Sequence, residues 1–302
     1  MSRHGAVKTT ARVLRVAVGA WVLSALVSVS FVSVSSVIAS PVSAQEWRDV
    51  SLSRVLGAQE LLNVRVRYGA GTFEMAATDD VDLLYGMELR YDEEQFEPVA
   101  EYADGSLEVG VESMRRSINF GKRRSQARMD LRLTPQVPLR LDVEVGAAEV
   151  DVDLTGLSIQ QLEFRTGASR SVIEISEPNP IRMSSAEFAA GAAEFTARGL
   201  GNLNTERLRI DAGVGDVTLD FTGNWQGDTR AEIDMGLGAL ELRFPRDLGV
   251  KLMKDSFLTS FDARGMVKRG DAYYSEGYSD ATYRMEIEVD AAFGSIEVVW
   301  LN

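Results

Sequence analysis

The stretch RIDAGVGDVTLDF, residues 209–221, alternates apolar and polar residues like a β-strand and yet carries two glycines at its centre. The apolar residues from Ile210 to Val214 share one parity, whereas those from Val217 onward share the other. Successive side chains of a strand point to opposite faces, so the change of parity means that one residue is inserted at Gly215, as at a bulge or a tight corner. The stretch therefore predicts a strand that turns a corner at this glycine.

The same motif recurs along the chain at a nearly fixed period. Its copies read RVRYGAGTFEM, DVEVGAAEVDVDL, EFRTGASRSVIEI, EFAAGAAEFTARGL, RIDAGVGDVTLDF, EIDMGLGALELRF and EVDAAFGSIEVVW. The leading position of the copies holds, in order, Gly69, Gly146, Gly167, Gly191, Gly213, Gly236 and Ala292. The steps between Gly146 and Gly236 are 21, 24, 22 and 23 residues, a period that indicates the stacked coils of a β-solenoid.

A small residue occupies the break in parity in every copy. These positions hold Gly71, Ala148, Ser169, Ala193, Gly215, Gly238 and Gly294. Glycine tolerates positive φ and lets neighbouring backbone come close, as a corner between stacked coils requires. A nucleotide-binding GxGxxG would need a helix after it, and a calcium-binding glycine repeat would recur every nine residues, so neither motif fits. We interpret these residues as structural corners.

The chain divides into a leading β domain and the repeat. Residues 45–136 contain alternating segments around Leu89 and Leu131, which predict a small antiparallel β domain. Residues 137–302 are predicted to form the solenoid. Within them, residues 250–283 break the period and are rich in Gly and Tyr, so we expect a capping hairpin and loop that covers the exposed end of the core.

Residues 1–44 have the character of a secretory signal peptide. Basic residues without an acid precede an apolar, Ser-rich run over residues 16–39, and the small residues Val42, Ser43 and Ala44 then fit a cleavage site. An uncleaved N-terminal membrane anchor is the alternative, because the run is long enough to span a bilayer. In either case the remaining chain is predicted to be exported, to the periplasm or another extracytoplasmic part of the cell envelope.

Composition removes whole classes of chemistry. The formal net charge is −13, which argues against nucleic-acid binding, since that relies on Lys and Arg to neutralise phosphates. The chain has no cysteine and a single histidine, His4, which lies in the predicted leader. Ser-His-Asp and Cys-His catalysis and His/Cys metal sites are therefore impossible in the exported part. We expect no catalytic residue, no cofactor and no metal.

Several phrases of the sequence resemble a known family. The corner motif at a period of about 22 residues, the phrases VPLRLDVEVGAAEVDVDLTGL and LRIDAGVGDVTLDFTG, and the turn into FPRDLGV resemble the toast-rack family of exported bacterial β-solenoid proteins. The segment with RVRYGAGTFEM, MELRYDEEQFEP and EYADGSLEVGV is similar to the small N-terminal toast-rack domain. The resemblance covers nearly all of the exported chain.

This resemblance implies a single-stacked β-solenoid related to the C-terminal domain of LiaF-like envelope-stress regulators and to proteins of unknown function. It supplies no catalytic residue. Ala or Ser at positions 148, 169 and 193 implies corners that are less tight there. LiaF-like regulators carry several membrane helices, whereas this chain has at most one, so a mechanism of their type does not carry over directly.

Without His or Cys, catalysis would have to use carboxylates. Asp211, Asp234 and Asp290 occupy the same motif position in three copies, as the clustered carboxylates of some β-helix polysaccharide enzymes do. Acidic residues are also the ordinary occupants of solvent-facing strand positions in a protein of this charge. We favour this second interpretation.

Two further clusters stand out. The basic one, in ESMRRSINFGKRRSQARMD, could touch anionic lipid headgroups or lipopolysaccharide phosphates, but we favour a solvated face paired with acidic neighbours. It consists of Arg115, Arg116, Lys122, Arg123, Arg124 and Arg128. The aromatic one could stack on sugars or cap the solenoid. It consists of Tyr273, Tyr274, Tyr278 and Tyr283.

The sequence therefore predicts an all-β exported protein, a non-catalytic β-solenoid scaffold or interaction module of the cell envelope. Its partner would be another envelope protein or an envelope polymer, with a link to envelope-stress sensing suggested by the family resemblance. A carbohydrate-binding or carbohydrate-active β-helix protein that uses Asp carboxylates is the alternative.

Overall fold

The computed structural model describes residues 47–113, 126–256 and 258–301. Within these residues the chain forms seventeen β-strands and one short 3-10 helix, which confirms the predicted all-β class. In chain order the elements are β1 (Trp47–Val55), β2 (Leu62–Ala77), β3 (Leu83–Asp92), β4 (Phe96–Ala103), β5 (Ser106–Ser113), β6 (Arg128–Leu133), β7 (Leu139–Asp153), β8 (Ile159–Thr166), β9 (Arg170–Glu174), β10 (Ser185–Arg198), η2 (Leu200–Leu203), β11 (Arg207–Asp220), β12 (Thr229–Pro245), β13 (Gly249–Ser256), β14 (Thr259–Asp262), β15 (Met266–Arg269), β16 (Ala272–Ser275) and β17 (Arg284–Leu301).

The predicted leader, residues 1–44, lies outside the described residues. Among the residues that are described, no helix has the length and apolar character needed to cross a membrane.

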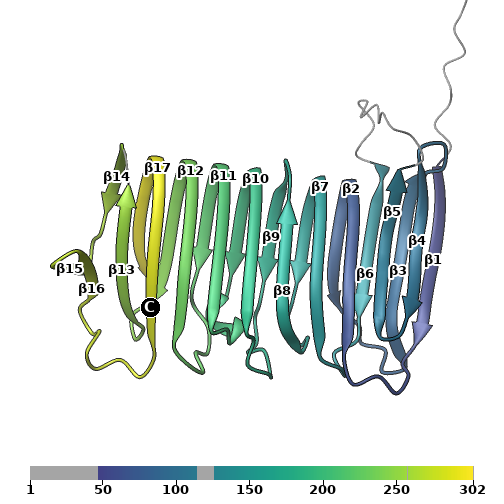
Figure 1. Ribbon diagram of the computed structural model, residues 1–302, viewed down its shortest axis with the longest axis horizontal. Coiled ribbons are helices and arrows are strands. Elements are labelled where there is room, and N and C mark those ends of the chain that lie inside the picture. The colour runs from purple at the N-terminus through teal and green to yellow at the C-terminus, as the bar shows by residue number, and fades with distance from the viewer. Residues whose placement is uncertain (1–46, 114–125, 257, 302) are drawn as a thin grey trace, which may run out of the picture. The chain divides into compact units, whose positions relative to one another are not determined.

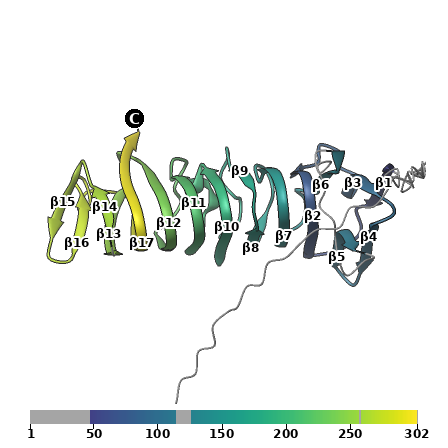
Figure 2. The same ribbon diagram turned by 90° about the horizontal axis from the view of Figure 1, so that it is seen from above.

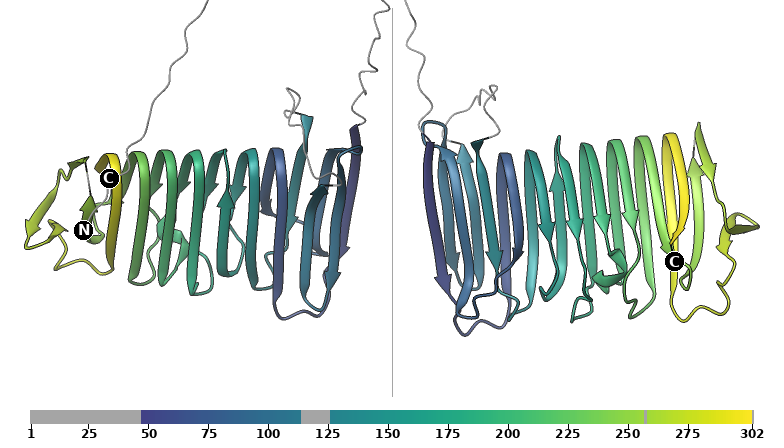
Figure 3. Two further views of the ribbon diagram at one scale, coloured as in Figure 1. Left: turned by 45° about the horizontal axis from the view of Figure 1, so that its top comes forward. Right: turned by 180° about the vertical axis from the view of Figure 1, so that it is seen from behind.

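The strands lie side by side in one continuous sheet, and the two further views in Figure 3 show the same order as Figure 1. Each repeat copy contributes one layer to this stack. The layer is usually one long strand, but one layer consists of two short strands, β8 and β9, which both pair with β7 on one side and with β10 on the other. From β2 to β17 the layers pair in parallel and in register, so that Ile210 faces Ile233, which in turn faces Val289. The repeated sequence therefore stacks like position on like position.

At both ends of the stack the strands leave the order of the sequence. β2 pairs directly with β7, although β3 to β6 lie between them in the chain. At the other end β17, the last strand of the chain, lies between β12 and the pair β13 and β14, as Figure 2 shows from above. Segments that come earlier or later in the sequence thus cover the two open ends of the repeat.

Residues 47–133 mix the two kinds of strand pairing. β1 with β3, β3 with β6, and β4 with β5 are antiparallel, as predicted for this region. β2 instead pairs in parallel with β5, β6 and β7, and it carries the first corner of the repeat. The described residues form one compact unit without a break near residue 136, and the predicted domain boundary there stays a prediction.

The corner in β11 has the predicted change of parity, with one correction. Ile210 and Ala212 are buried before the corner, and Val217 and Leu219 are buried after it. Val214, expected to point inward with Ile210, is instead 52% exposed. The three residues Gly213 to Gly215 lie at the bend itself, where neither face of the strand is covered, so the side chain between the two glycines points to solvent.

Two constraints make glycine necessary at the corners of the later layers. Gly215 and Gly238 have φ of +143° and +146°, a region that residues with a side chain rarely adopt. A Cβ atom on Gly238 would also collide with the carbonyl oxygen of Gly215 in the preceding layer. Ala148 and Ser169 fill the same position in earlier layers without positive φ. Positive φ is therefore a property of some corners and not of all.

One continuous core runs along the inside of the stack. Aromatic rings of successive layers meet there: Phe221 and Phe244 are stacked with their ring centroids 5.1 Å apart, and Phe244 contacts Trp300 at 5.6 Å. On the side opposite the corners, buried asparagines satisfy the backbone of the connecting loops. Asn202, for example, donates to the carbonyl of Ile175 at 2.8 Å and accepts from the amide of Asn224 at 2.7 Å. Packing and buried hydrogen bonds thus hold successive layers together.

Residues 249–275 cover the far end of the core. β13 and β14 extend the parallel stack by one layer beyond β17, whereas β15 and β16 form an antiparallel hairpin. β16 then pairs antiparallel with β13. The predicted cap therefore contains a hairpin, as expected, but it begins with a further parallel layer that the sequence pattern did not reveal.

Candidate functional site

The outward side chains of the strands before the corner form straight columns, because the layers are in register. One of these, named here the charge column, runs two residues ahead of the leading glycine through the whole stack. In spatial order it contains Arg67, Glu144, Arg165, Ala189, Asp211, Asp234, Asp290 and Asp255. Among the surface hollows of the described residues, two larger ones lie along this side of the molecule, one toward each end of the column.

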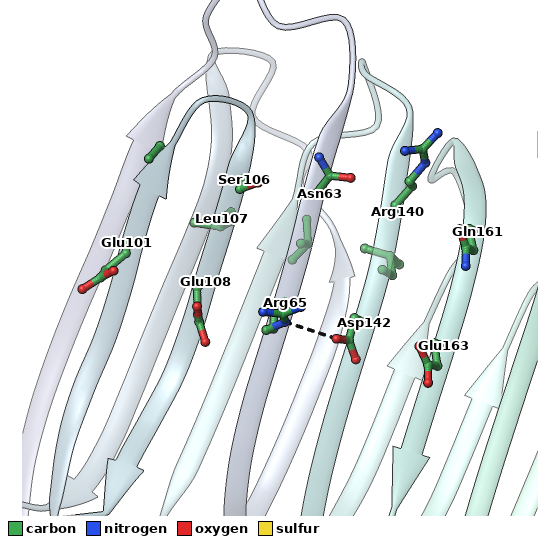
Figure 4. Close-up of a pocket in the computed structure, with 13 residues that line it drawn as sticks. Asn63, Arg65, Glu101, Ser106, Leu107, Glu108, Arg140, Asp142, Gln161 and Glu163 are labelled. Atoms are coloured by element: carbon green, nitrogen blue, oxygen red, sulfur yellow. Dashed lines mark hydrogen bonds and ion pairs between the residues drawn. The ribbon is translucent and has the colours of Figure 1, made fainter.

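The first hollow, the polar cleft, lies over β5, β2, β7 and β8 and has a volume of about 420 Å³ (Figure 4). Arg65 and Asp142 meet across it, with Nε and Oδ2 3.2 Å apart. Asp142 also accepts from Arg165, whose Nη2 lies 2.6 Å from Oδ1. Glu101, Glu108 and Arg140 stand around the same opening.

The chemistry of the polar cleft is that of a charged surface whose central groups are already paired. Asp142 is shared by two guanidinium groups, and Arg165 also contacts Glu163. These bonds occupy the carboxylate oxygens that a cation would need. Within the described part of the chain no group of three or more acidic or histidine side chains is arranged to hold a metal ion.

The three aspartates singled out from the sequence are brought together, as neighbours on β11, β12 and β17. Arg209 binds two of them: its Nη2 lies 3.0 Å from Oδ1 of Asp211 and 2.6 Å from Oδ2 of Asp234. Partial burial, a hydrogen bond with Asp211 and the charges of Asp211 and Asp290 raise the pKa of Asp234, and Arg209 opposes this rise. The net environment therefore disfavours the charged form of Asp234.

The second hollow, the corner groove, follows these aspartates along β8, β10, β11, β12 and β17, with a volume of about 620 Å³. It is open to solvent and mostly apolar, because Ala190, Ala212, Met235 and the leading glycines line it, and Arg165 stands at its β8 end. Beside the glycines, one residue further along each strand, stand the exposed side chains of Val214 and Leu237. The groove thus has an apolar floor, a carboxylate wall on one side and an apolar ridge on the other.

Thr166 closes one end of the corner groove and has an unsatisfied hydroxyl. Its side chain lies on the inner parity of β8, next to Ala190, and only 7% of the residue is exposed. The Oγ1 atom finds no hydrogen-bond partner in the protein, although buried hydroxyl groups are normally paired. This oxygen is buried within the protein and is not part of the exposed surface of the groove.

The predicted basic cluster is only partly described. Its members Arg115, Arg116, Lys122, Arg123 and Arg124 lie outside the described residues. Arg128, on β6, donates to Glu74 at 2.8 Å. Contact of this cluster with a membrane stays a prediction.

The predicted aromatic cluster gathers in the cap. Tyr273 packs edge-on against Phe261, and Tyr274 packs edge-on against Tyr278. A cation lies over each of three rings: Lys268 over Tyr273, Arg269 over Tyr274 and Arg284 over Tyr278, at 5.4, 5.6 and 5.7 Å from the ring centroids. Tyr283 packs against the core. These contacts agree with a capping role for the tyrosines.

Sequence reasoning identified the aspartates but missed both hollows. The polar cleft is built by β5, β2, β7 and β8, and β5 becomes a neighbour of β2 only through the change of strand order at this end. The corner groove could have been found from the residue between the two small corner residues, which is Ala in the first four copies and Val, Leu and Phe in the last three. That change is visible in the sequence once the copies are aligned.

Several solved bacterial structures are similar to this chain at low sequence identity. A candidate cell adhesion protein from Clostridium sporogenes is 18% identical, with a TM-score of 0.42, over 84% of this chain and all of its own. A candidate adhesin from Bacteroides fragilis is 9% identical, with a TM-score of 0.34, over 83% of this chain and 97% of its own. A candidate lipid binding protein from Parabacteroides distasonis is 12% identical, with a TM-score of 0.33, over 82% and 96%. At this distance the likenesses assign no function.

No curated protein matches the chain. A family profile does: the N-terminal domain of toast_rack, DUF2154, matches residues 40–198 and 187–243. The matched region covers more than half of the chain and includes the corner motifs from β2 to β12. The chain therefore belongs to the toast-rack family.

Proposed function

We propose that this chain is a non-catalytic, exported protein of the cell envelope, a single-stacked β-solenoid that serves as an interaction module. The observation that carries the proposal is the corner groove. It extends over five strands of the stack and is bordered by exposed apolar side chains. An open groove of this length suits a macromolecule better than a small substrate, which enzymes normally enclose in a concave pocket.

The arrangement of the aspartates supports a non-catalytic role. Glycoside hydrolysis needs two carboxyl groups that face each other across the scissile bond, about 5 to 9.5 Å apart. Asp211 and Asp234 instead stand side by side on neighbouring strands, about 4.8 Å apart along one wall, and Arg209 binds both. Neither is placed opposite the other across a substrate position.

Carbohydrate binding through the tyrosines has less support. Stacking on a sugar needs a free ring face. Tyr273, Tyr274 and Tyr278 each have a cation over the ring and an aromatic neighbour or the core beside it. Packing within the cap accounts for the positions of these rings without a bound sugar.

Export and a link to envelope stress are the finer parts of the proposal. Export rests on the signal-like leader, and mass spectrometry of the mature protein should find its N-terminus at Gln45. Recovery of residues 16–39 in a membrane fraction would show an anchor instead. The stress link rests on the family resemblance alone.

Photo-crosslinking in living cells tests the interaction role. A photoreactive amino acid at Leu237, which is 49% exposed beside the groove, should give adducts with an envelope protein or polymer. The matched control is Val267, 45% exposed in the hairpin of the cap, which should give few. Equal yields at both positions, or none at Leu237, would contradict the proposal.

A further inference from the structure

In the later half of the charge column, like charges lie on neighbouring strands and repel one another. Asp211, Asp234, Asp290 and Asp255 face one another in register on four neighbouring strands. Like charges directly opposite each other destabilise a sheet. Arg209 is the cation that binds them among the described residues, and it reaches only Asp211 and Asp234. A cationic ligand along this wall would relieve the repulsion.

The corner groove next to this wall offers apolar contacts. Its floor of glycine, alanine and methionine is apolar, and Val214 and Leu237 stand about half exposed at its other side. The surface therefore combines an anionic wall and an apolar ridge, which together fit a ligand that is cationic along one side and apolar along the next.

The spacing of the layers selects the form of that ligand. Neighbouring strands lie about 4.8 Å apart, so the three aspartates from Asp211 to Asp290 span about 10 Å. Side chains at i, i+3 and i+7 of an α-helix lie at about 0, 4.5 and 10.5 Å along its axis. Alternate residues of an extended peptide lie at about 0, 6.7 and 13 Å. A helix parallel to the stack matches the aspartates, and an extended peptide does not.

We propose that the corner groove binds a basic amphipathic α-helix of a protein partner, which lies along the stack. Lys or Arg at i, i+3 and i+7 would pair with Asp211, Asp234 and Asp290, and the neighbouring apolar stripe would pack on Val214 and Leu237. This inference rests on the proposed role of the groove as an interaction surface and names the class of partner.

The test uses the full exported chain and two labelled synthetic peptides of about 15 residues. One carries lysines at i, i+3 and i+7 with leucines at i+4, i+8 and i+11, and the other has the same composition with lysine and leucine alternating. Fluorescence anisotropy should show that the first peptide binds at least about tenfold more tightly, and that its affinity falls as salt is raised. Equal affinity of the two peptides would overturn the proposal.

Three variants locate the site. Asp234→Asn should weaken binding of the helical peptide about tenfold, since it removes one charged contact, and Leu237→Ser should weaken it by a similar factor. Glu144→Gln is the matched control: it changes charge equally in the same column, outside the groove, and should leave the affinity within about twofold. Equal losses in Asp234→Asn and Glu144→Gln would show mere adsorption to an acidic protein and overturn the proposal.

The failure of this inference differs from the failure of the proposed function. If Leu237 crosslinks to an envelope polymer in cells while neither peptide binds, the groove is an interaction surface and its occupant is not a basic helix. If Leu237 gives no adduct at all, the interaction role itself fails.

Discussion

The two halves of the charge column differ in the signs of the charges that face each other on neighbouring strands. In the early layers Arg67, Glu144 and Arg165 alternate in sign, and opposite charges face each other on neighbouring strands. In the later layers Asp211 faces Asp234, which faces Asp290, so that like charges stand opposite each other. The fold is the same in both halves, so this difference is not required by the fold. It separates the layers in which opposite charges face each other from those in which like charges do.

The corners differ in the same direction. The residue between the two small corner residues is Ala147 in β7, but it is Val214 in β11 and Leu237 in β12. Val214 and Leu237 are 52% and 49% exposed. Exposed apolar residues in a row cost solubility and mark interaction surfaces when they form a contiguous patch. Both features therefore concentrate in the later layers.

In the core of the stack, equivalent substitutions in the two halves should have similar effects on stability. The variants with the largest expected effects test this. Leu219 in β11 and Met75 in β2 occupy equivalent inward positions and are almost completely buried. Leu219→Ala and Met75→Ala should each lower the free energy of unfolding by about 2 to 5 kcal/mol in urea titrations, because each leaves a cavity. Thr218→Val, on the outward parity of β11, should change it by about 0.5 kcal/mol or less. A large effect in only one half would mean that the core is not continuous.

The corners of β7 and β12 should differ in their need for glycine. Gly238→Val should cost about 2 to 4 kcal/mol of unfolding free energy, because the residue has positive φ and the Gly215 carbonyl occupies the place of the new side chain. Ala148→Gly changes the equivalent corner of β7, where a side chain is already accommodated, and should cost only about 0.5 to 1 kcal/mol. Equal costs in guanidinium titrations would show that the corner glycines are not needed.

The smallest predicted effects have opposite signs in the two halves. Glu144→Gln should lower the free energy of unfolding by roughly 0.2 to 1 kcal/mol, since Glu144 stands between Arg67 and Arg165. Asp234→Asn should raise it at pH 7, by no more than about 0.5 kcal/mol, because the native environment disfavours the charged carboxylate.

The pH dependence of the second variant follows from the direction of its pKa shift. The folded state raises the pKa of Asp234 above its ordinary value of 3.8, so the native protein binds this proton more tightly than the unfolded chain does. Ionised Asp234 therefore opposes folding above the folded-state pKa, and the cost disappears as the pH falls toward about 3.8. The advantage of Asp234→Asn in thermal or urea unfolding should vanish below about pH 4. An advantage that grows on acidification would contradict the assigned environment.

The sequence predicted the layers of the stack but not the order of the strands at its ends. The glycine period and the change of parity predicted where β11 and β12 bend, because both are local properties of a strand. The position of Val214 was mispredicted, since alternation no longer determines side-chain direction at the bend. The insertion of β17 between β12 and β13 could not be predicted, because copies aligned along the chain carry no information about which copy is next in space.

The candidate site was also predictable only in part. Alignment of the copies placed Asp211, Asp234 and Asp290 in one row, and the parallel register confirms that they are neighbours. The link through Arg209 depends on side-chain geometry and was not foreseen. The unpaired hydroxyl of Thr166 depends on what surrounds it in three dimensions, and no sequence pattern marks it.

The central claim is that the copies stack in parallel and in register, with the last strand of the chain beside β12. Because the chain has no cysteine, a pair of introduced cysteines reports on this directly. Glu241 and Glu297 face each other on β12 and β17, about 4.8 Å apart, a Cα separation that a disulfide spans. Oxidation of the double variant Glu241→Cys, Glu297→Cys should therefore give a rapid and complete intramolecular disulfide. The control pair Glu241→Cys, Ser295→Cys is displaced by two residues, to about 8 Å, and should not close without strain. Closure of the control as readily as the in-register pair, or failure of the in-register pair to close, would contradict the stack.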